Sequence, residues 1–460
     1  MNRQQPSMLQ GSIWRGLLSF AIPIFLGNLF QQLYNTADTL IVGNFLGKEA
    51  LAAVSSSGNL IFMLVGFLSG MAMGAGVLIS KYFGAGDREK LRAAVHTDLA
   101  FGLAAGLVLT VVGVVLTPQI LRWMGTPENV LPQSVAYFRT YFCGSVFLFL
   151  YNVSTGILQA VGDSRHPLYY LITSSAINVA LDLLFVGVFR WGVASAAAAT
   201  AISQGVSALL CLRRLICSQE VYRVEPRQVR IQWPVLKLIV RFGLPSGVQN
   251  SVIGLANVVV QANINAFGDS AMAGCGSYSK IEGFAFLPVT CFSMALATFV
   301  GQNLGAGQHQ RVRQGARFGA LCSMLTAEAV GVVIWVGAPF FIGLFNSDPE
   351  VVAFGVRQAR VIAPFYCLLA LNHCMAGILR GAGKATVPMA VMLAVWCLVR
   401  VSYITIAVGV WRDILVVFTA YPLTWSISAV IFLIYYLKAD WIHTFDRLDA
   451  DGPTAGRKAS

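Results

Sequence analysis

Long apolar segments alternate with short polar connections along almost the whole chain. A helix of about 20 residues crosses the roughly 30 Å hydrocarbon core of a bilayer, and a chain in lipid must satisfy its backbone hydrogen bonds internally. The pattern therefore predicts an all-α integral membrane protein with twelve transmembrane helices. The expected spans are 15–40, 51–78, 94–116, 135–160, 168–189, 193–216, 236–266, 276–301, 316–342, 355–379, 388–410 and 414–437.

The second half of the chain repeats the first. Three stretches return at a shift of 221 or 222 positions, namely 18–23 as 240–245, 79–86 as 300–307, and 156–162 as 377–383. Six spans per repeat give both copies the same orientation, so we expect two six-helix lobes related by a pseudo-two-fold axis along the membrane normal. The expected organisation is an N-lobe at 1–212, a cytoplasmic linker at 213–235, a C-lobe at 236–437 and a disordered cytoplasmic tail at 438–460.

Composition and charge agree with a membrane protein and give its orientation. The chain is 57% apolar and 11% charged, with a net charge of +12. With the N-terminus placed inside, 23 of the 32 Lys and Arg residues fall on the cytoplasmic side and 8 outside, and one lies within a span. This positive-inside bias predicts a multi-pass protein of the cytoplasmic membrane with both termini in the cytoplasm. It also accounts for the basic charge without a nucleic-acid partner.

Two aspartates lie within predicted spans, where a charge is costly and marks a functional site by default. Asp38 lies in the outer half of the first span. An interfacial aspartate capping the turn at Gly43 and Gly47 is the alternative, but the apolar residues 40–42 argue against it. Asp182 and Asn178 are four residues apart and share one helix face, so their oxygens could bind Na⁺, or the carboxylate could take a proton. A structural hydrogen bond from Asp182 to a neighbouring helix remains open.

Further polar residues lie in neighbouring spans. Asn152 and Thr200 could complete a cluster with the aspartates, although such residues commonly link helices in membranes. Glu282 and Arg400 are embedded in the C-lobe as secondary candidates. A surface pair with Lys280 is an equal alternative for Glu282, and the partner of Arg400 is unknown. The nine cysteines contain no Cys-x-x-Cys, and we expect no metal site.

The sequence resembles the multidrug and toxic compound extrusion (MATE) family from about Gly11 to Leu437. The matching features are the two six-span repeats, the end of span one at 36–39, and the stretch 83–86 with its echo at 302–307. The stretches 281–288 and 377–381 resemble the DinF-like branch of that family.

The resemblance implies a secondary antiporter, not an enzyme, that exports organic cations by alternating access. It implies no cofactor beyond the coupling ion, H⁺ or Na⁺, no catalytic residue, and a monomer in the lipid bilayer. The family's cation cluster is matched at Asp38, Asn152, Asn178, Asp182 and Thr200. An acidic residue that another branch carries early in span seven is missing, because 249–253 is uncharged. We favour H⁺, for which two carboxylates suffice.

Other functions are less consistent with the sequence. A lipid-linked oligosaccharide flippase of the same superfamily would need a more cationic cleft, whereas the embedded charges here are mainly acidic apart from Arg400. A major-facilitator transporter would not carry the repeated Gly-Ala-Gly stretches. The chain contains no nucleotide-binding loop and no Gly-x-Ser-x-Gly, which argues against ATP-driven transport and an intramembrane hydrolase. A channel or receptor stays open.

Overall fold

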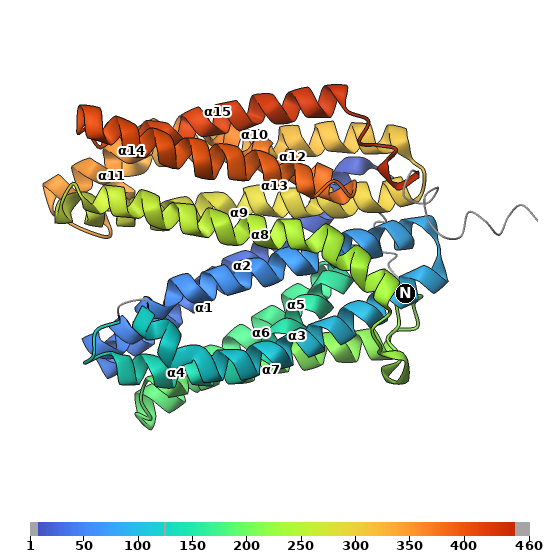
Figure 1. The fold of residues 1–460 in the computed structure, drawn as a ribbon, viewed down its shortest axis with the longest axis horizontal. Coiled ribbons are helices and arrows are strands. Elements are labelled where there is room, and N and C mark those ends of the chain that lie inside the picture. Colours follow the sequence, from blue (N-terminus) through green and yellow to red (C-terminus); the bar gives the residue numbers. More distant parts are fainter. Residues whose placement is uncertain (1–7, 124–125, 447–460) are drawn as a thin grey trace, which may run out of the picture. The chain divides into compact units, whose positions relative to one another are not determined.

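The computed structural model describes residues 8–123 and 126–446, apart from the side chains of 48, 49, 51–53 and 55–63. Helices are the regular secondary structure of the described ranges, joined by turns and irregular connections (Figure 1). The chain forms two compact units, one of Ile22–Gly243 and one of Leu244–Ser460 with Met1–Ala21. We call the first unit the N-lobe and the second the C-lobe. The division falls within the first helix of each sequence repeat.

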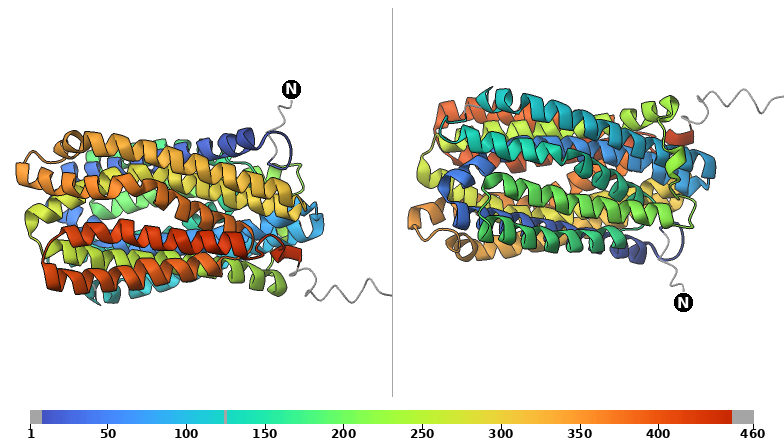
Figure 2. Two further views of the ribbon diagram at one scale, coloured as in Figure 1. Left: turned by 90° about the horizontal axis from the view of Figure 1, so that it is seen from above. Right: turned by 90° about the horizontal axis from the view of Figure 1, so that it is seen from below.

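The N-lobe is built from long antiparallel helices with short connections (Figures 1 and 2). Within it, α5 packs against α2, α3 and α7, while α7 also packs against α4 and α6. Its elements are α1 (Ile13–Leu46), α2 (Lys48–Ala85), α3 (Arg88–Trp123), α4 (Leu131–Cys143), α5 (Ser145–Ala160), α6 (Arg165–Asp182), the π-helix η1 (Leu183–Val188), α7 (Val193–Cys217) and the short 3₁₀ helix η2 (Pro226–Gln228).

The C-lobe repeats this plan. Helix α9 packs against α10, α11 and α12, and α12 also packs against α15. Its elements are α8 (Trp233–Asn265), α9 (Asp269–Gly305), α10 (His309–Gly343), α11 (Pro349–Ile362), the 3₁₀ turn η3 (Ala363–Phe365), α12 (Tyr366–Gly381), α13 (Thr386–Met392), the π-helix η4 (Leu393–Val399), α14 (Arg400–Trp411) and α15 (Leu415–Lys438).

The predicted spans coincide with these helices, with two differences. Among the described residues, ten helical segments are long and apolar enough to cross a membrane, and α4 with α5 forms an eleventh that bends by 46°. The bend lies at Gly144, where a Cβ would come 2.5 Å from the Cβ of Ala201 on α7. Helix α8 fills the seventh predicted span, but polar residues such as Gln249, Asn250 and Gln261 lower its hydropathy.

The repeated sequence stretches form repeated turns. Gly86 and Gly307 follow α2 and α9 with φ of 68° and 70°, and Gly162 and Gly383 follow α5 and α12 with φ of 96° and 77°. A residue with a side chain rarely adopts these left-handed values. The glycines of the repeated stretches are therefore required to end these four helices.

The packing of two helices differs between the repeats at one pair of equivalent glycines. A Cβ on Gly377 of α12 would lie 2.3 Å from the backbone oxygen of Ser293 on α9. At the matching position of α5, a Cβ on Gly156 would lie 3.6 Å from the backbone oxygen of Ala72, an ordinary contact. Helices α9 and α12 are thus in closer contact at this point than α2 and α5.

A buried aspartate organises the turn between α5 and α6. Oδ1 of Asp163 accepts a hydrogen bond from the backbone N–H of His166 at 3.2 Å, and Oδ2 lies 2.6 Å from Nδ1 of the same residue. Burial alone would raise the pKa of Asp163, but the bonds from His166 and the charges of His166 and Arg214 together lower it. The ionised form of Asp163 therefore stabilises the start of α6.

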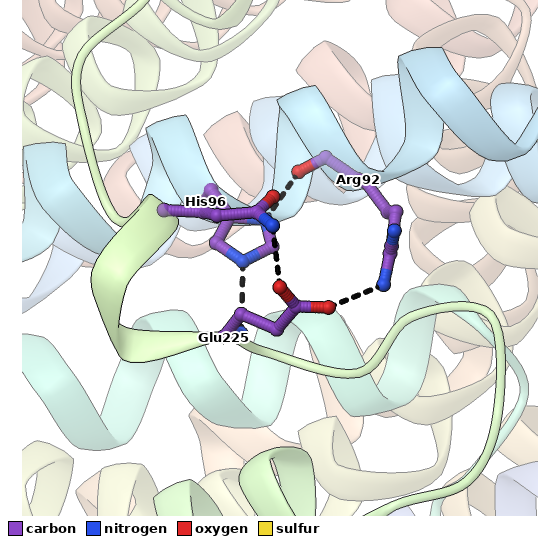
Figure 3. Close-up of polar contacts among 4 residues, drawn as sticks. Arg92, His96 and Glu225 are labelled. Carbon is purple, nitrogen blue, oxygen red and sulfur yellow. Dashed lines mark hydrogen bonds and ion pairs between the residues drawn. The ribbon is translucent and has the colours of Figure 1, made fainter.

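The connection between α7 and α8 is docked on α3 (Figure 3). Nε2 of the buried His96 accepts a hydrogen bond from the backbone N–H of Glu225 at 3.0 Å, while Nδ1 lies 2.7 Å from the backbone oxygen of Arg92. These partners require a neutral imidazole that carries its hydrogen on Nδ1. The carboxylate of Glu225 also pairs with the Arg92 guanidinium at 2.6 Å and accepts from Gln228. Hydrogen bonds and an ion pair thus hold the stretch around Glu225 against α3.

The chain beyond α15 continues as a packed segment. The side chains of Trp441, Ile442 and Phe445 are buried, and Nε1 of Trp441 donates to the backbone oxygen of Tyr436 at 3.1 Å. The remainder of the predicted tail, 447–460, lies outside the described residues.

Candidate functional site

The two aspartates predicted from the sequence lie together in the N-lobe. Asp38 lies near the far end of α1, and Asp182 is the last residue of α6. Their carboxyl groups are within hydrogen-bonding reach of one another, so a proton on either can be shared with the other. As two carboxylates they are acceptors only, and both oxygens of the fully buried Asp182 then lack a donor among the described residues.

Asn178 and Thr200 extend the site on the neighbouring helices. Nδ2 of Asn178 donates to Oγ1 of Thr200 on α7 at 3.5 Å, and Thr200 donates in turn to the backbone oxygen of Ala196 at 3.1 Å. Oδ1 of Asn178 is buried and has no donor within the described chain. Because Asn178 and Asp182 share one face of α6, this oxygen belongs to the same cluster as the carboxylates.

Asn152 does not join this hydrogen-bonded group. Its Nδ2 donates to the backbone oxygen of Leu148 on its own helix, α5, at 2.8 Å. In the part of the chain that the structure describes, none of the other four residues is its hydrogen-bond partner. Four of the five predicted residues are therefore brought together by direct contacts or a shared helix face. The fifth, Asn152, instead hydrogen-bonds the backbone of its own helix.

A break in helical geometry follows the site. Helix α6 ends at Asp182 and continues directly as the π-helix η1, whose wider turns are frequent at functional sites. Val186 of η1 packs in a hydrophobic core with Val42 of α1 and Phe138 of α4. This core lies a few residues beyond each aspartate along its helix, and it fixes α1 and α6 relative to one another.

Tyrosines surround the carboxylates, and the sequence analysis did not identify them. Tyr34 is one turn before Asp38 on α1, and Tyr137 on α4 lies in the electrostatic field of both aspartates. The rings of Tyr137 and Tyr141 stack with their centroids 6.5 Å apart. Aromatic faces attract organic cations. The sequence feature that could have identified them is the four-residue spacing of two tyrosines within a predicted span. That spacing is equally typical of a helix packed in a protein core.

The secondary candidates of the C-lobe form a separate cluster, in which Arg400 is buried and Glu282 is half-buried. Nε and Nη2 of Arg400 donate to Oγ1 of Thr424 at 3.1 and 2.8 Å, and the guanidinium lies 4.5 Å from the ring centroid of Tyr421. Its charge also acts on the carboxylate of Glu282, which accepts a hydrogen bond from the hydroxyl of Tyr278. Lys280, the partner in the alternative of a surface pair, lies with its ammonium 5.6 Å from the ring centroid of Phe345.

The two clusters occupy related positions in the repeats. At the shift of 221 positions, Asn152 corresponds to His373 and Thr200 to Tyr421, while Arg400 corresponds to the residue after Asn178. His373 is in ring contact with Trp396, over which the Arg400 guanidinium also lies. The duplicated scaffold thus holds carboxylates in one lobe and an arginine with aromatic rings in the other.

Comparison with known proteins identifies the family. The family model MatE matches residues 23–184 and 245–406, which is most of both repeats. The chain belongs to the MATE family. It is a member of a family of multi-pass membrane transporters, and the two matched ranges fall on the two halves of the internal repeat. The DinF-like branch is not decided by this match.

Relatives of the MATE protein extend over nearly its full length. It is 30% identical over 434 residues to a probable multidrug resistance protein, YoeA, of Bacillus subtilis, covering 92% of this chain and 94% of the relative. It is 28% identical over 390 residues to a probable multidrug resistance protein, NorM, of Thermotoga maritima, covering 84% and 83%. The fold matches a crystal structure of a MATE transporter in complex with MaL6 at a TM-score of 0.88 and 22% identity, covering 96% and 98%.

Proposed function

We propose that this MATE transporter exports organic cations in exchange for H⁺, or for Na⁺, by alternating access. The observation that carries the proposal is the adjacency of the Asp38 and Asp182 carboxyl groups, with no ion pair to either among the described residues. Two like charges about 4 Å apart repel by about 4 kcal/mol at an effective dielectric constant of 20. A site of this kind gains free energy by taking up a cation.

Competition for the carboxylates couples the two cations. A cationic substrate held against the tyrosine rings near Asp38 is attracted by the same negative charge that binds the ion. Uptake of H⁺ or Na⁺ neutralises that charge, which weakens the substrate's binding and releases it. Linkage requires each ligand to lower the affinity for the other by the same factor.

A proton is the ion we favour. A single proton between Asp38 and Asp182 removes the repulsion and supplies the donor that the buried oxygens lack. The oxygen of Asn178 would offer Na⁺ one further ligand. The gradient experiment described below distinguishes the two ions.

We place both termini in the cytoplasm from the distribution of Lys and Arg, and we take the monomer as the working unit because the cluster lies within one lobe. We assign the chain to the DinF-like branch on the stretches 281–288 and 377–381.

The relatives do not favour the flippase alternative. The two described above are named as multidrug resistance proteins. The arginine that a pyrophosphate group would need is held in the C-lobe by Thr424, with its guanidinium over the rings of Trp396 and Tyr421.

Efflux of a cationic dye from proteoliposomes tests the proposal. A pH gradient and a Na⁺ gradient are imposed separately on vesicles that contain the wild type, Asp38→Asn, or the control Glu89→Gln, which removes an exposed carboxylate of the same lobe. We expect efflux driven by one gradient in the wild type and the control, and its loss in Asp38→Asn. Efflux that ignores both gradients, or that is undiminished in Asp38→Asn under the same gradient, would refute the antiport mechanism.

A further inference from the structure

Two histidines and an aspartate meet at one end of the C-lobe, far along the chain from the residues used above. His309 is the first residue of α10, and His443 and Asp446 belong to the segment that follows α15. One ligand atom from each lies within 4.8 Å of those of the other two. The imidazole rings are 4.9 Å apart between centroids and tilted by 33°. In Figure 1 the segment after α15 turns back at the end of the lobe where α9 and α10 are joined.

The hydrogen bonds of the two histidines leave nitrogen atoms for a ligand. Nδ1 of His443 lies 2.6 Å from Oδ1 of Asp440. A carboxylate bound to one ring nitrogen orients the imidazole and makes the other nitrogen a better metal ligand. Nδ1 of His309 is buried and has no hydrogen-bond partner in the described chain. A buried nitrogen without a partner is costly, and a metal ion would satisfy it.

The donor set selects the class of metal. Two imidazole nitrogens and one carboxylate oxygen suit Zn²⁺ and the neighbouring ions Co²⁺, Ni²⁺ and Cu²⁺, whereas Ca²⁺ and Mg²⁺ prefer oxygen ligands only. The charges are compatible, because Asp440 and Asp446 contribute two carboxylates. The nearby Arg311 donates to the backbone oxygen of Gly11 at 2.8 Å and is thus engaged with another segment.

We propose that His309, His443 and Asp446 bind a divalent transition-metal ion of the zinc class, with water in the remaining coordination position. The ion links the segment after α15 to the start of α10. Trp441, Ile442 and Phe445 already bury that segment against the lobe, so the metal reinforces an existing packing arrangement. The site lies outside the carboxylate cluster and does not depend on the proposed antiport.

Metal titration of the full-length protein tests the site. The protein is purified in detergent, treated with a chelator, and titrated with ZnCl₂ by calorimetry and with CoCl₂ by visible absorption, where tetrahedral Co²⁺ gives strong d–d bands. We expect one ion per chain for the wild type. We expect at least a tenfold loss of affinity in His443→Ala and in His309→Gln, and loss of the d–d bands in both.

The chain supplies a matched control. His166 has the same arrangement with Asp163, at 2.6 Å and three residues apart, as His443 has with Asp440, but it belongs to no metal-competent cluster in the described residues. His166→Gln should therefore bind Zn²⁺ as the wild type does. Asp446→Asn, an exposed change that keeps both imidazoles, should weaken binding and alter the Co²⁺ spectrum. Equal binding in the wild type, His309→Gln and His443→Ala, or a tenfold loss in His166→Gln, would overturn the proposal.

Discussion

Replacement of Asp182 by asparagine separates the charge of the cluster from its shape. Asparagine is nearly isosteric with aspartate, and Asp182 is fully buried with both oxygens lacking a donor. The substitution removes one of the two negative charges that attract the coupling ion in the proposed antiport. It leaves Asp38 and the oxygen of Asn178 in place, so the remaining site can still accept an ion, but with lower affinity.

The size of the effect follows from Coulomb's law at a separation typical of neighbouring charged groups. Each carboxylate attracts a bound cation by about 4 kcal/mol at a separation of about 4 Å and an effective dielectric constant of 20. This free energy corresponds to roughly a thousandfold in the ion's dissociation constant. Because Asp38 and Asp182 act on one ion, the losses should not be additive for transport, and the double variant should be no slower than the slower single variant.

Gradient-driven dye efflux measures both the apparent affinity for the ion and the rate of transport. The ion concentration that gives half-maximal efflux is determined for the wild type, Asp38→Asn, Asp182→Asn and the double variant, with Glu89→Gln as the charge-removal control. We expect a shift of at least a hundredfold, or no measurable coupling, in each single variant. A shift of less than tenfold in Asp182→Asn, or a double variant slower by the product of both single effects, would refute the shared site.

Three further predictions concern stability, measured by thermal unfolding of the detergent-solubilised protein. Gly377→Ala should cost about 1–3 kcal/mol because its Cβ meets a backbone oxygen, whereas Gly156→Ala at the equivalent position should be tolerated; equal losses would contradict the difference in packing. Asp163→Asn should cost about 1 kcal/mol at neutral pH. Folding lowers the pKa of this carboxyl below 3.8. The stability difference between Asp163→Asn and the wild type should therefore vanish as the pH falls through that lowered value. A stability difference that grows in acid would exclude a stabilising role for the ionised carboxylate. His96→Phe should cost about 1–3 kcal/mol, because the backbone N–H of Glu225 loses its acceptor. Glu225→Gln, which removes only an exposed ion pair with Arg92, should cost less than about 1 kcal/mol. The reverse order would show that the bond from Glu225 to His96 does not hold this connection on α3.

The helices and their duplication were predictable because hydrophobic length and repeated glycines are local properties of the sequence. The bend at Gly144 was not, because it depends on contact with Ala201, 57 positions away. The π-helices that follow Asp182 and precede Arg400 were also missed. An apolar run has the same composition in a π-helix as in an α-helix, so hydropathy does not distinguish them.

The candidate site was predictable in part. Asp38 and Asp182 were found because carboxylates within spans are rare, and the structure places them side by side. Their tyrosine neighbours were not found, because a tyrosine in a membrane helix is common and only the packing of α4 against the site singles out Tyr137. For Arg400, the sequence showed an embedded charge but could not show Thr424 or the aromatic rings around it.

The unequal chemistry of the two repeats has an electrical consequence. When all groups are ionised, the N-lobe cluster carries two negative charges, whereas Glu282 and Arg400 cancel as a pair. A membrane potential does work of about 2.3 kcal/mol on each elementary charge per 100 mV. Movement of the C-lobe pair as a unit is therefore insensitive to voltage. Of the two clusters, only the N-lobe carboxylates carry a net charge, so in the proposed antiport the occupancy of that cluster is the step that senses the membrane potential.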